Sequence, residues 1–253
     1  MFDFTNVEKF KEQCGYEING RWYPRVTKIV DIKSKPALYR FYGEAASYNA
    51  AKEITENSAK EGTLIHEIVE KIMVGENPEV PAAIQPAINA FLEFLNQKNI
   101  QVDKEFVEKR IFHPAHRYAG TIDTLALVDG KFGVLDIKTS QAIYRDYNLQ
   151  TSAYIEALLS ELPSLETRWI LRIDQIHTCL NCGSTMRPKG GRNKIRKGKK
   201  FPCPQDGHQW ADLTGVVELQ EFPFWQEDFQ AFLGAKRLWE WENQYWLKQA
   251  GYL

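Results

Sequence analysis

The hydrophobic pattern of the chain changes its period near residue 100, and this change restricts the folds that are available. Apolar residues recur at helical spacing over 60–74 and again over 82–98. Beyond them the pattern becomes that of strands, with an Asp129-Gly130 pair that is typical of a two-residue hairpin turn. The strands expected in this part are 104–112, 120–128 and 131–138. The sequence therefore predicts helices followed by a β-meander.

The second half returns to helices and adds another pair of strands. Helices are expected at 143–161 and at about 225–248, with paired strands at 167–174 and 214–221 between them. This order predicts the α/β (α+β) class, in which a central mixed sheet is flanked by helices. The 253 residues suffice for one sizeable domain with an embellishment.

Charge is spread unevenly along the chain, although the net charge is only −1. Segment 183–200 holds eight basic residues and no acid, which leaves 24 basic and 33 acidic residues elsewhere. The eight are Arg187, Lys189, Arg192, Lys194, Arg196, Lys197, Lys199 and Lys200. A basic run that contains glycine is either a solvated loop or a contact to the phosphates of a nucleic acid. We take the eight as candidate nucleic-acid-binding residues.

Two cysteine-containing pairs of possible metal ligands enclose this basic run. Cys179 and Cys182 have the spacing of a metal knuckle, and Cys203 is followed by His208. Thiolate and imidazole donors suit tetrahedral Zn²⁺, so the sequence predicts a structural zinc site, with free thiols as the alternative. The segment resembles the zinc ribbons of type I topoisomerases, although a histidine here replaces the last cysteine.

An Asp-x-Lys pair lies on the last strand of the meander. Side chains two residues apart on a strand share a face, so Asp136 and Lys138 point the same way, and Asp123 lies on the neighbouring strand. Two carboxylates that converge at a hairpin can hold a divalent cation, and a lysine beside them can position water or stabilise charge at a phosphate. The alternative is a surface salt bridge between Asp136 and Lys138.

Two further pairs flank these residues, one in the preceding helix and one in the following helix. In order along the chain, the four elements are Gly62/His66, Gly120/Asp123, Asp136/Lys138 and Gln150/Tyr154. This series of G-x-x-x-H, G-x-x-D, D-x-K and Q-x-x-x-Y resembles the PD-(D/E)XK nuclease superfamily, and most closely its RecB-type exonuclease branch. The resemblance covers about residues 60–155.

The resemblance implies a role for each matching residue. The catalytic set would be Asp123, Asp136, Lys138, Gln150 and Tyr154. A Mg²⁺ or Mn²⁺ ion would be held by His66, Asp123, Asp136 and the backbone carbonyl of Ile137, with Glu108 as a further candidate on the strand before. Lys138 would orient the attacking water, while Gln150 and Tyr154 would touch the substrate strand or support Lys138. Glu67 is excluded because it faces ~100° away from His66 on the helix.

The resemblance also implies the domain organisation. Residues 1–175 and 212–253 would form a restriction-endonuclease-like core whose N-terminal helical part is about 1–58. Residues 176–211 would be a basic, zinc-ribbon-like insertion in a late β-hairpin. Some RecB-type nucleases instead hold a [4Fe–4S] cluster through one early and three late cysteines. Cys14 with the three later cysteines follows that order, but the long gap between Cys182 and Cys203 favours zinc.

The expected function is a metal-dependent DNA nuclease, an exonuclease acting on ends or single strands in recombination, repair or replication. A site-specific or structure-specific endonuclease of the same fold is the first alternative, and a non-catalytic nucleic-acid-binding module is the second. DNA is the expected partner, with a helicase or recombination protein as a further candidate. No apolar run approaches the ~18 residues of a membrane span, so a cytoplasmic protein is expected. A compact nuclease of this kind would suit a virus or a mobile element.

Aromatic residues are frequent in the C-terminal helix. Five of them share one helical stripe and are expected in the core, namely Trp225, Phe229, Phe232, Trp239 and Trp246. Trp241 lies off this stripe and is expected to be exposed.

Overall fold

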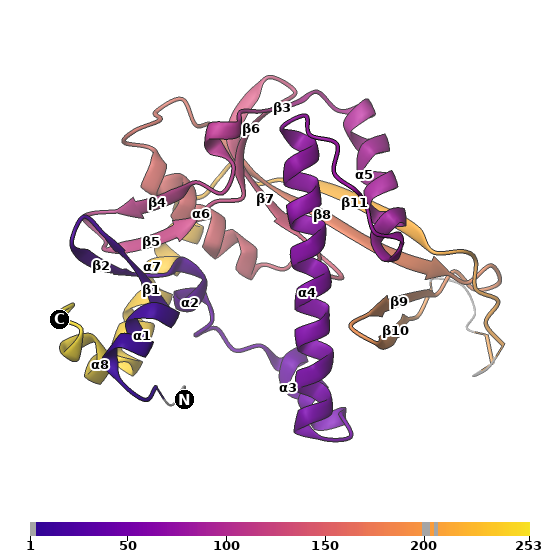
Figure 1. Cartoon of the computed structure of the whole chain (residues 1–253), viewed down its shortest axis with the longest axis horizontal. Coiled ribbons are helices and arrows are strands. Elements are labelled where there is room, and N and C mark those ends of the chain that lie inside the picture. Colours follow the sequence, from indigo (N-terminus) through magenta and orange to yellow (C-terminus); the bar gives the residue numbers. More distant parts are fainter. Residues whose placement is uncertain (1–3, 199–202, 205–206) are drawn as a thin grey trace.

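A mixed β-sheet forms the centre of the molecule and is flanked by helices (Figure 1). The structure is a computed structural model that describes residues 4–198, 203–204 and 207–253. The strand order is β10-β9-β8-β7-β6-β3, and β11 also pairs with β8. The strands are β3 (Ile100–Val102), β6 (Thr124–Val128), β7 (Lys131–Lys138), β8 (Thr167–Thr178), β9 (Thr185–Lys189), β10 (Arg192–Arg196) and β11 (Thr214–Glu221). The β7–β8 pair is parallel and the others are antiparallel. The predicted α+β class with a mixed sheet is confirmed.

Strand β7 is buried on both faces, so its side chains divide between two cores. Val134 belongs to the core that contains α6 (Asp146–Leu158) and α7 (Gln226–Glu242). Leu135 and Ile137 belong to the other core, beneath α4 (Tyr48–Met73) and α5 (Gln85–Gln97). Asp136 and Lys138 follow the register of Val134 and therefore point toward the α6 layer.

The helix predicted at 60–74 is the second half of a longer helix, α4, which has 26 residues. The side chain of Ser47 accepts a hydrogen bond from the Ala50 amide at its start, as an N-cap does. Gly75 follows the helix with a φ of +81°, a conformation that glycine adopts without strain. The helix predicted at 82–98 is also present, as the short turn η1 (Ala82–Ile84) continued by α5.

Two predicted strands are wrong in their extent. Residues 104–112 do not form one strand but a short turn, η2 (Lys104–Phe106), followed by β4 (Arg110–His113). Residues 120–128 divide into β5 (Tyr118–Thr121), which pairs with β4, and β6, which pairs with β7. The reason is a change of sheet at residue 122, which alternation alone does not reveal because both halves remain buried.

Residues 4–45 contain both helices and strands. A hairpin of β1 (Gly15–Ile18) and β2 (Arg21–Pro24) connects the first of three helices to the second. These helices are α1 (Val7–Cys14), α2 (Val26–Val30) and α3 (Pro36–Glu44).

The later elements agree with the prediction more closely. The expected helix at 143–161 is α6, and the expected strand pair is β8 with β11, with the cysteine-containing insertion between them. The C-terminal helix is interrupted at Asn243 and continues as α8 (Gln244–Gln249). None of the helices in the described part of the chain combines the length and the apolar character that a membrane span requires.

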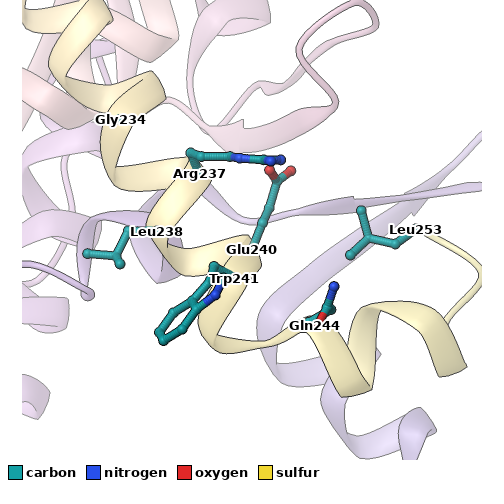
Figure 2. A pocket seen from close by; sticks show the side chains of 7 residues that line it. All are labelled: Gly234, Arg237, Leu238, Glu240, Trp241, Gln244 and Leu253. Atoms are coloured by element: carbon teal, nitrogen blue, oxygen red, sulfur yellow. The ribbon is translucent and has the colours of Figure 1, made fainter.

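The aromatic stripe of α7 lies in the core as expected. Of the five residues, Phe229, Phe232 and Trp239 are buried, whereas Trp225 and Trp246 are only partly buried and pack against the core. Trp241 is 71% exposed, as expected. Trp241 borders a pocket between α7 and Leu253 that is also lined by Arg237 and Glu240 (Figure 2). This pocket contains none of the predicted catalytic residues.

A buried ion pair joins β8 to the start of α7. The Arg168 guanidinium is completely buried and contacts the Asp228 carboxylate, while its Nη2 also donates to the carbonyl of Phe224. We expect Asp228→Asn to lower the free energy of unfolding by about 3 kcal/mol, because it leaves a buried cation without its counter-charge. Urea denaturation measures this change.

Two variants provide the control for this prediction. Arg168→Met combined with Asp228→Asn removes both charges and should recover most of the lost stability. Glu12→Gln breaks an exposed pair with Lys9 and should cost less than about 1 kcal/mol. Equal losses for Asp228→Asn and Glu12→Gln would contradict this account of the buried pair.

Candidate functional site

The site begins at the bend between β5 and β6, where Asp123 leaves both sheets. Its Oδ2 accepts a hydrogen bond from the backbone amide of Ile137, at 2.6 Å. The β6–β7 ladder ends at the pair Thr124–Leu135, so the carboxylate takes the place that a strand carbonyl would occupy. Asp123 is thereby fixed beside Asp136, although it lies in the bend and not on a hairpin strand as predicted.

Asp136 and Lys138 form a buried ion pair at the end of β7. The Lys138 Nζ lies 2.5 Å from Asp136 Oδ2, and the Asp136 side chain is fully buried. Burial raises the pKa of Asp136 to about 6, although the Lys138 charge opposes this. Burial also works against the charge of Lys138, but the carboxylates of Asp136 and Asp123 outweigh it and raise the Lys138 pKa. The contact is therefore not the surface salt bridge considered as the alternative.

Gln150 and Tyr154 on α6 support Asp136. The Gln150 Nε2 donates to Asp136 Oδ1 at 3.1 Å and to Tyr154 Oη at 3.0 Å. Tyr154 is only 2% exposed, so its ring has no surface for contact with a substrate strand. A Cβ at Gly120 would lie 2.5 Å from the Tyr154 ring, which explains why a glycine stands there. Of the two predicted roles, the structure favours support, directed to Asp136 and not to Lys138.

Tyr147 also contacts the site, and the sequence analysis missed it. The Lys138 Nζ lies 5.1 Å from the centroid of the Tyr147 ring, within the range of a cation–π contact. Tyr147 precedes Gln150 by three residues on α6, so it shares that helix face. This spacing was the only available signal.

His66 on α4 lies close to Asp123. Its Nδ1 lies 3.9 Å from Asp123 Oδ2 and 3.8 Å from Glu70 Oε1. Ligand atoms of these three residues lie within 4.8 Å of one another, so the group could hold a metal ion. Burial lowers the pKa of His66, but the two carboxylates raise it by more. Glu70 was missed, although its i, i+4 spacing from His66 on one helix is visible in the sequence.

A close contact between α4 and the end of β7 brings His66 into place. A Cβ at Gly62 would lie 2.8 Å from the Oγ1 of Thr139, the residue that follows Lys138. A Cβ at this position would require the Thr139 side chain to shift. Because α4 lies close to Thr139 at Gly62, His66, one turn further along the helix, is positioned near the end of β7.

Glu108 lies beside this cluster, but in a loop and not on a strand as predicted. Its φ is +51°, and its amide donates to the carbonyl of Asp123 at 3.0 Å. Burial, together with the charges of Glu70 and Asp123, raises the pKa of Glu108 to about 7. The Oε1 atom of Glu70 is buried and has no hydrogen-bond partner among the residues that the structure describes. Such an excess of carboxylates around one imidazole suits a divalent cation.

The cluster opens onto a groove of about 630 Å³ along α4. Gly62, His66, Glu70, Glu108 and Thr139 contribute to its lining. Asp136 remains engaged by Lys138 and Gln150, and Ile137 presents its amide to Asp123. The structure thus brings predicted residues from all four sequence elements into one region. Of the predicted cation ligands, His66 and Asp123 belong to the group whose ligand atoms lie within 4.8 Å, and Asp136 does not.

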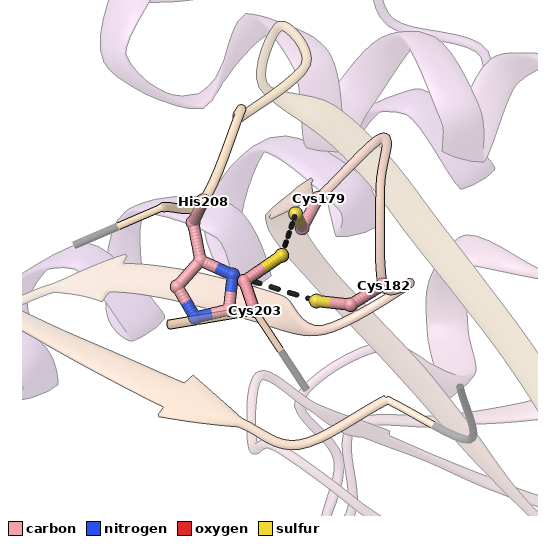
Figure 3. Close-up of side chains that lie close together, drawn as sticks. All are labelled: Cys179, Cys182, Cys203 and His208. Atoms are coloured by element: carbon pink, nitrogen blue, oxygen red, sulfur yellow. Dashed lines mark hydrogen bonds between the residues drawn. The ribbon is translucent and has the colours of Figure 1, made fainter. Parts of the chain in front are cut away.

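A second group of metal-ligating side chains lies in the insertion (Figure 3). Cys179, Cys182, Cys203 and His208 bring their ligand atoms within 4.8 Å of one another, as predicted. The Cys179 and Cys203 sulfurs are 3.9 Å apart, and the Cys182 sulfur lies 3.4 Å from His208 Nδ1. These four residues could hold a metal ion.

The surroundings of Cys182 favour its thiolate form. The Ser184 hydroxyl lies 3.1 Å from the Cys182 sulfur, and this contact lowers the Cys182 pKa to about 5. The Gly198 amide donates to Ser184 Oγ at 3.0 Å and holds this side chain in place. Thiolates are the form in which cysteines bind metals.

Cys14 is not part of this group. It lies at the end of α1, buried in the same core as Phe10 and Trp22, and burial raises its pKa to about 11. Figure 1 places α1 and the β9–β10 hairpin at opposite sides of the molecule. The four-cysteine set of the iron–sulfur alternative is therefore not assembled.

The eight predicted nucleic-acid-binding residues have different environments. Lys194, Arg196 and Lys197 are exposed on or next to β10. Arg192 lies near the Glu44 carboxylate, at 3.8 Å. Arg187 and Lys189 of β9 point inward instead, and both donate to the Thr139 carbonyl. Lys199 and Lys200 lie outside the described residues.

Comparisons with known proteins add no relative from which a role could be transferred. No protein-family model matches this sequence, and no curated protein matches it. The geometry of the two clusters is therefore what indicates a function for this chain.

Glu70 provides a direct test of the cation site. We expect Glu70→Gln to weaken Mn²⁺ binding by about 10- to 100-fold, a loss typical for removal of a group at a metal site. Isothermal titration calorimetry with Mn²⁺ measures the affinity. Glu53→Gln removes the same charge from an exposed position near the other end of α4 and should change the affinity by less than about threefold. Equal effects of the two substitutions would exclude Glu70 as a ligand.

Proposed function

We propose that the chain is a metal-dependent nuclease of the PD-(D/E)XK type that hydrolyses phosphodiester bonds in DNA. The observation that supports this most directly is the meeting of Asp123, Asp136 and Lys138 where β7 ends. Two carboxylates and a lysine lie there with His66 at the edge of an open groove. Buried charges of this kind are costly to a fold, and they are typical of catalytic sites.

The residues at the groove fit a hard divalent cation. His66, Asp123 and Asp136 would hold it together with the Ile137 carbonyl. Glu70 and Glu108 add two further carboxylates, which is more than a single cation requires. A bound Mg²⁺ or Mn²⁺ would stabilise the negative charge that develops on the phosphate. The imidazole favours Mn²⁺ over Mg²⁺.

The remaining residues prepare the site for attack by water. Asp136 keeps Lys138 protonated, so its ammonium group can orient the attacking water through a hydrogen bond. Gln150 holds Asp136 Oδ1 and thereby keeps the other oxygen toward Lys138. Tyr154 fixes Gln150 in turn.

The proposed substrate is a DNA end or a single strand, and the proposed activity is that of an exonuclease. The groove along α4 would receive the strand, and the exposed Lys194, Arg196 and Lys197 would contact phosphates. The acidic centre repels a polyanion unless a cation is bound, so binding of DNA and of metal would be linked. A helicase or recombination protein that exposes single strands would suit this activity.

A cleavage assay tests the proposal. We expect end-labelled single- and double-stranded DNA to release mononucleotides in the presence of Mg²⁺ or Mn²⁺. Asp136→Asn should slow this release by at least ~10³-fold, because several kcal/mol of transition-state stabilisation depend on the centre. The Asp129→Asn variant changes an exposed carboxylate in the β6–β7 turn and should retain full activity.

The products separate the competing functions. Discrete internal fragments would indicate an endonuclease of the same fold. Absence of cleavage by the unmodified protein under both metals, with DNA binding retained, would indicate a binding module without catalysis.

We also propose that the Cys/His cluster of the insertion holds Zn²⁺. Tetrahedral Zn²⁺ with sulfur ligands at about 2.3 Å requires sulfurs about 3.8 Å apart. The observed distance of 3.9 Å between Cys179 and Cys203 agrees with this geometry. The mixed donor set of three cysteines and one histidine is common in structural zinc sites.

Metal analysis of the purified protein tests this assignment. We expect a colourless protein that contains one Zn²⁺ per chain, and we expect Cys182→Ser to lose it and to lower the Tm. Cys14→Ser is the matched control and should keep the metal, since that thiol lies elsewhere in the fold. A brown protein that loses its colour in Cys14→Ser would instead support the iron–sulfur assignment.

A further inference from the structure

The β9–β10 hairpin of the insertion lies directly against α4. Gly190 forms its turn with a φ of +61°, and a Cβ there would lie 2.1 Å from Ser58 Oγ and 2.4 Å from the Ile54 carbonyl. Both the backbone conformation and the available space therefore require glycine. This contact holds the hairpin against the helix that carries His66.

The hairpin also reaches the residue that follows the catalytic lysine. Arg187 Nη2 and Lys189 Nζ each donate to the Thr139 carbonyl at 2.6 Å. Arg187 is held in turn by the buried Asp174, whose two oxygens lie 2.7 and 2.6 Å from its Nε. Hydrogen bonds from cationic donors are among the strongest in proteins.

These contacts replace a strand ladder that has ended. The parallel pairing of β7 with β8 stops at Lys138 and Arg172, so Thr139 lies beyond the end of this ladder. Its side chain is confined by Gly62 of α4, and its carbonyl is bound by the two cations of β9. Thr139 is therefore fixed from both sides, one peptide bond away from Lys138.

The charged side chain of Lys189 is partly buried, which is energetically unfavourable for a residue that only contacts phosphates at the surface. Burial and the nearby Arg187 charge lower the pKa of Lys189 to about 8. A lysine that only attracted phosphates would lie in solvent, as Lys194 and Lys197 do. The inward direction of Lys189 thus indicates a role within the fold of the site.

We propose that Arg187 and Lys189 are positioning residues of the nuclease centre, which fix Lys138 through the Thr139 carbonyl and make the insertion a structural part of the active site. This inference rests on the proposed function, since it concerns the same centre. It assigns the two residues a role different from that of the exposed cations on β10. It predicts that their loss impairs turnover while substrate binding is retained.

Steady-state kinetics of Lys189 variants test the proposal. Lys189→Met should lower kcat by about 10- to 100-fold, the size of effect that a small misplacement of a catalytic group produces, with KM changed by less than about twofold. Lys189→Arg keeps a donor and should restore most of kcat. Lys52→Met removes an exposed charge from α4 and should leave both constants unchanged. In the Asp136→Asn background, Lys189→Met should bind single-stranded DNA with unchanged affinity.

Hydrogen–deuterium exchange gives a measure that does not require nuclease activity. Peptides that cover 138–142 should exchange at least about fivefold faster in Lys189→Met than in the unmodified protein, while peptides of α6 should not change. If the unmodified protein cleaves no DNA, the proposed function fails, and the exchange rates still decide whether Lys189 holds Thr139. Unchanged exchange would overturn the inference. A weaker DNA affinity with a shallower salt dependence and an unchanged kcat would overturn it too, because it would make Lys189 a phosphate contact.

Discussion

The hydrogen bond from the Ile137 amide to the Asp123 carboxylate is the contact on which the rest of the site depends. The chain leaves the small β4–β5 sheet after β5 and joins the central sheet at β6. This bond fixes the bend between β5 and β6 against the end of β7. Because a side chain here completes a strand ladder, Asp123 cannot move without disturbing the end of β7. A carboxylate in this position is held by the backbone and still has its remaining lone pairs for a cation.

Three glycines allow neighbouring helices and strands around the site to approach one another closely. Gly62 admits Thr139, Gly120 admits the Tyr154 ring, and Gly190 admits α4 to the hairpin turn. Each of these contacts joins an element that carries a functional residue to its neighbour. The glycines at positions 62 and 120 therefore serve packing, and the charged residues beside them form the candidate site.

Much of the fold follows from periodicity, and the differences have physical causes. The Asp129-Gly130 turn and the β8–β11 pair follow directly from alternation and turn residues, because these signals are local. The bend at Asp123 does not, since it depends on which sheet each half of a buried strand joins. The inward direction of Arg187 depends on Asp174, 13 residues earlier in the chain. From composition alone, Arg187 is predicted to be part of a basic loop. Glu70 was within reach of the sequence, because its spacing from His66 places both on one face.

The position of the Cys/His cluster has a consequence for how the chain folds. The pairing of β8 with β11 continues beyond the named strands, through Thr178 with Ala211 and Leu180 with Gln209. Cys179 and His208 lie at this end of the hairpin, next to the isolated bridge between Cys179 and Trp210. Joining them through a shared ion would convert a long, entropically costly connection into a short one. Metal binding by the insertion would then hold the ends of β8 and β11 together during folding. Strand β11 would therefore pair with β8 most readily once the ion was bound.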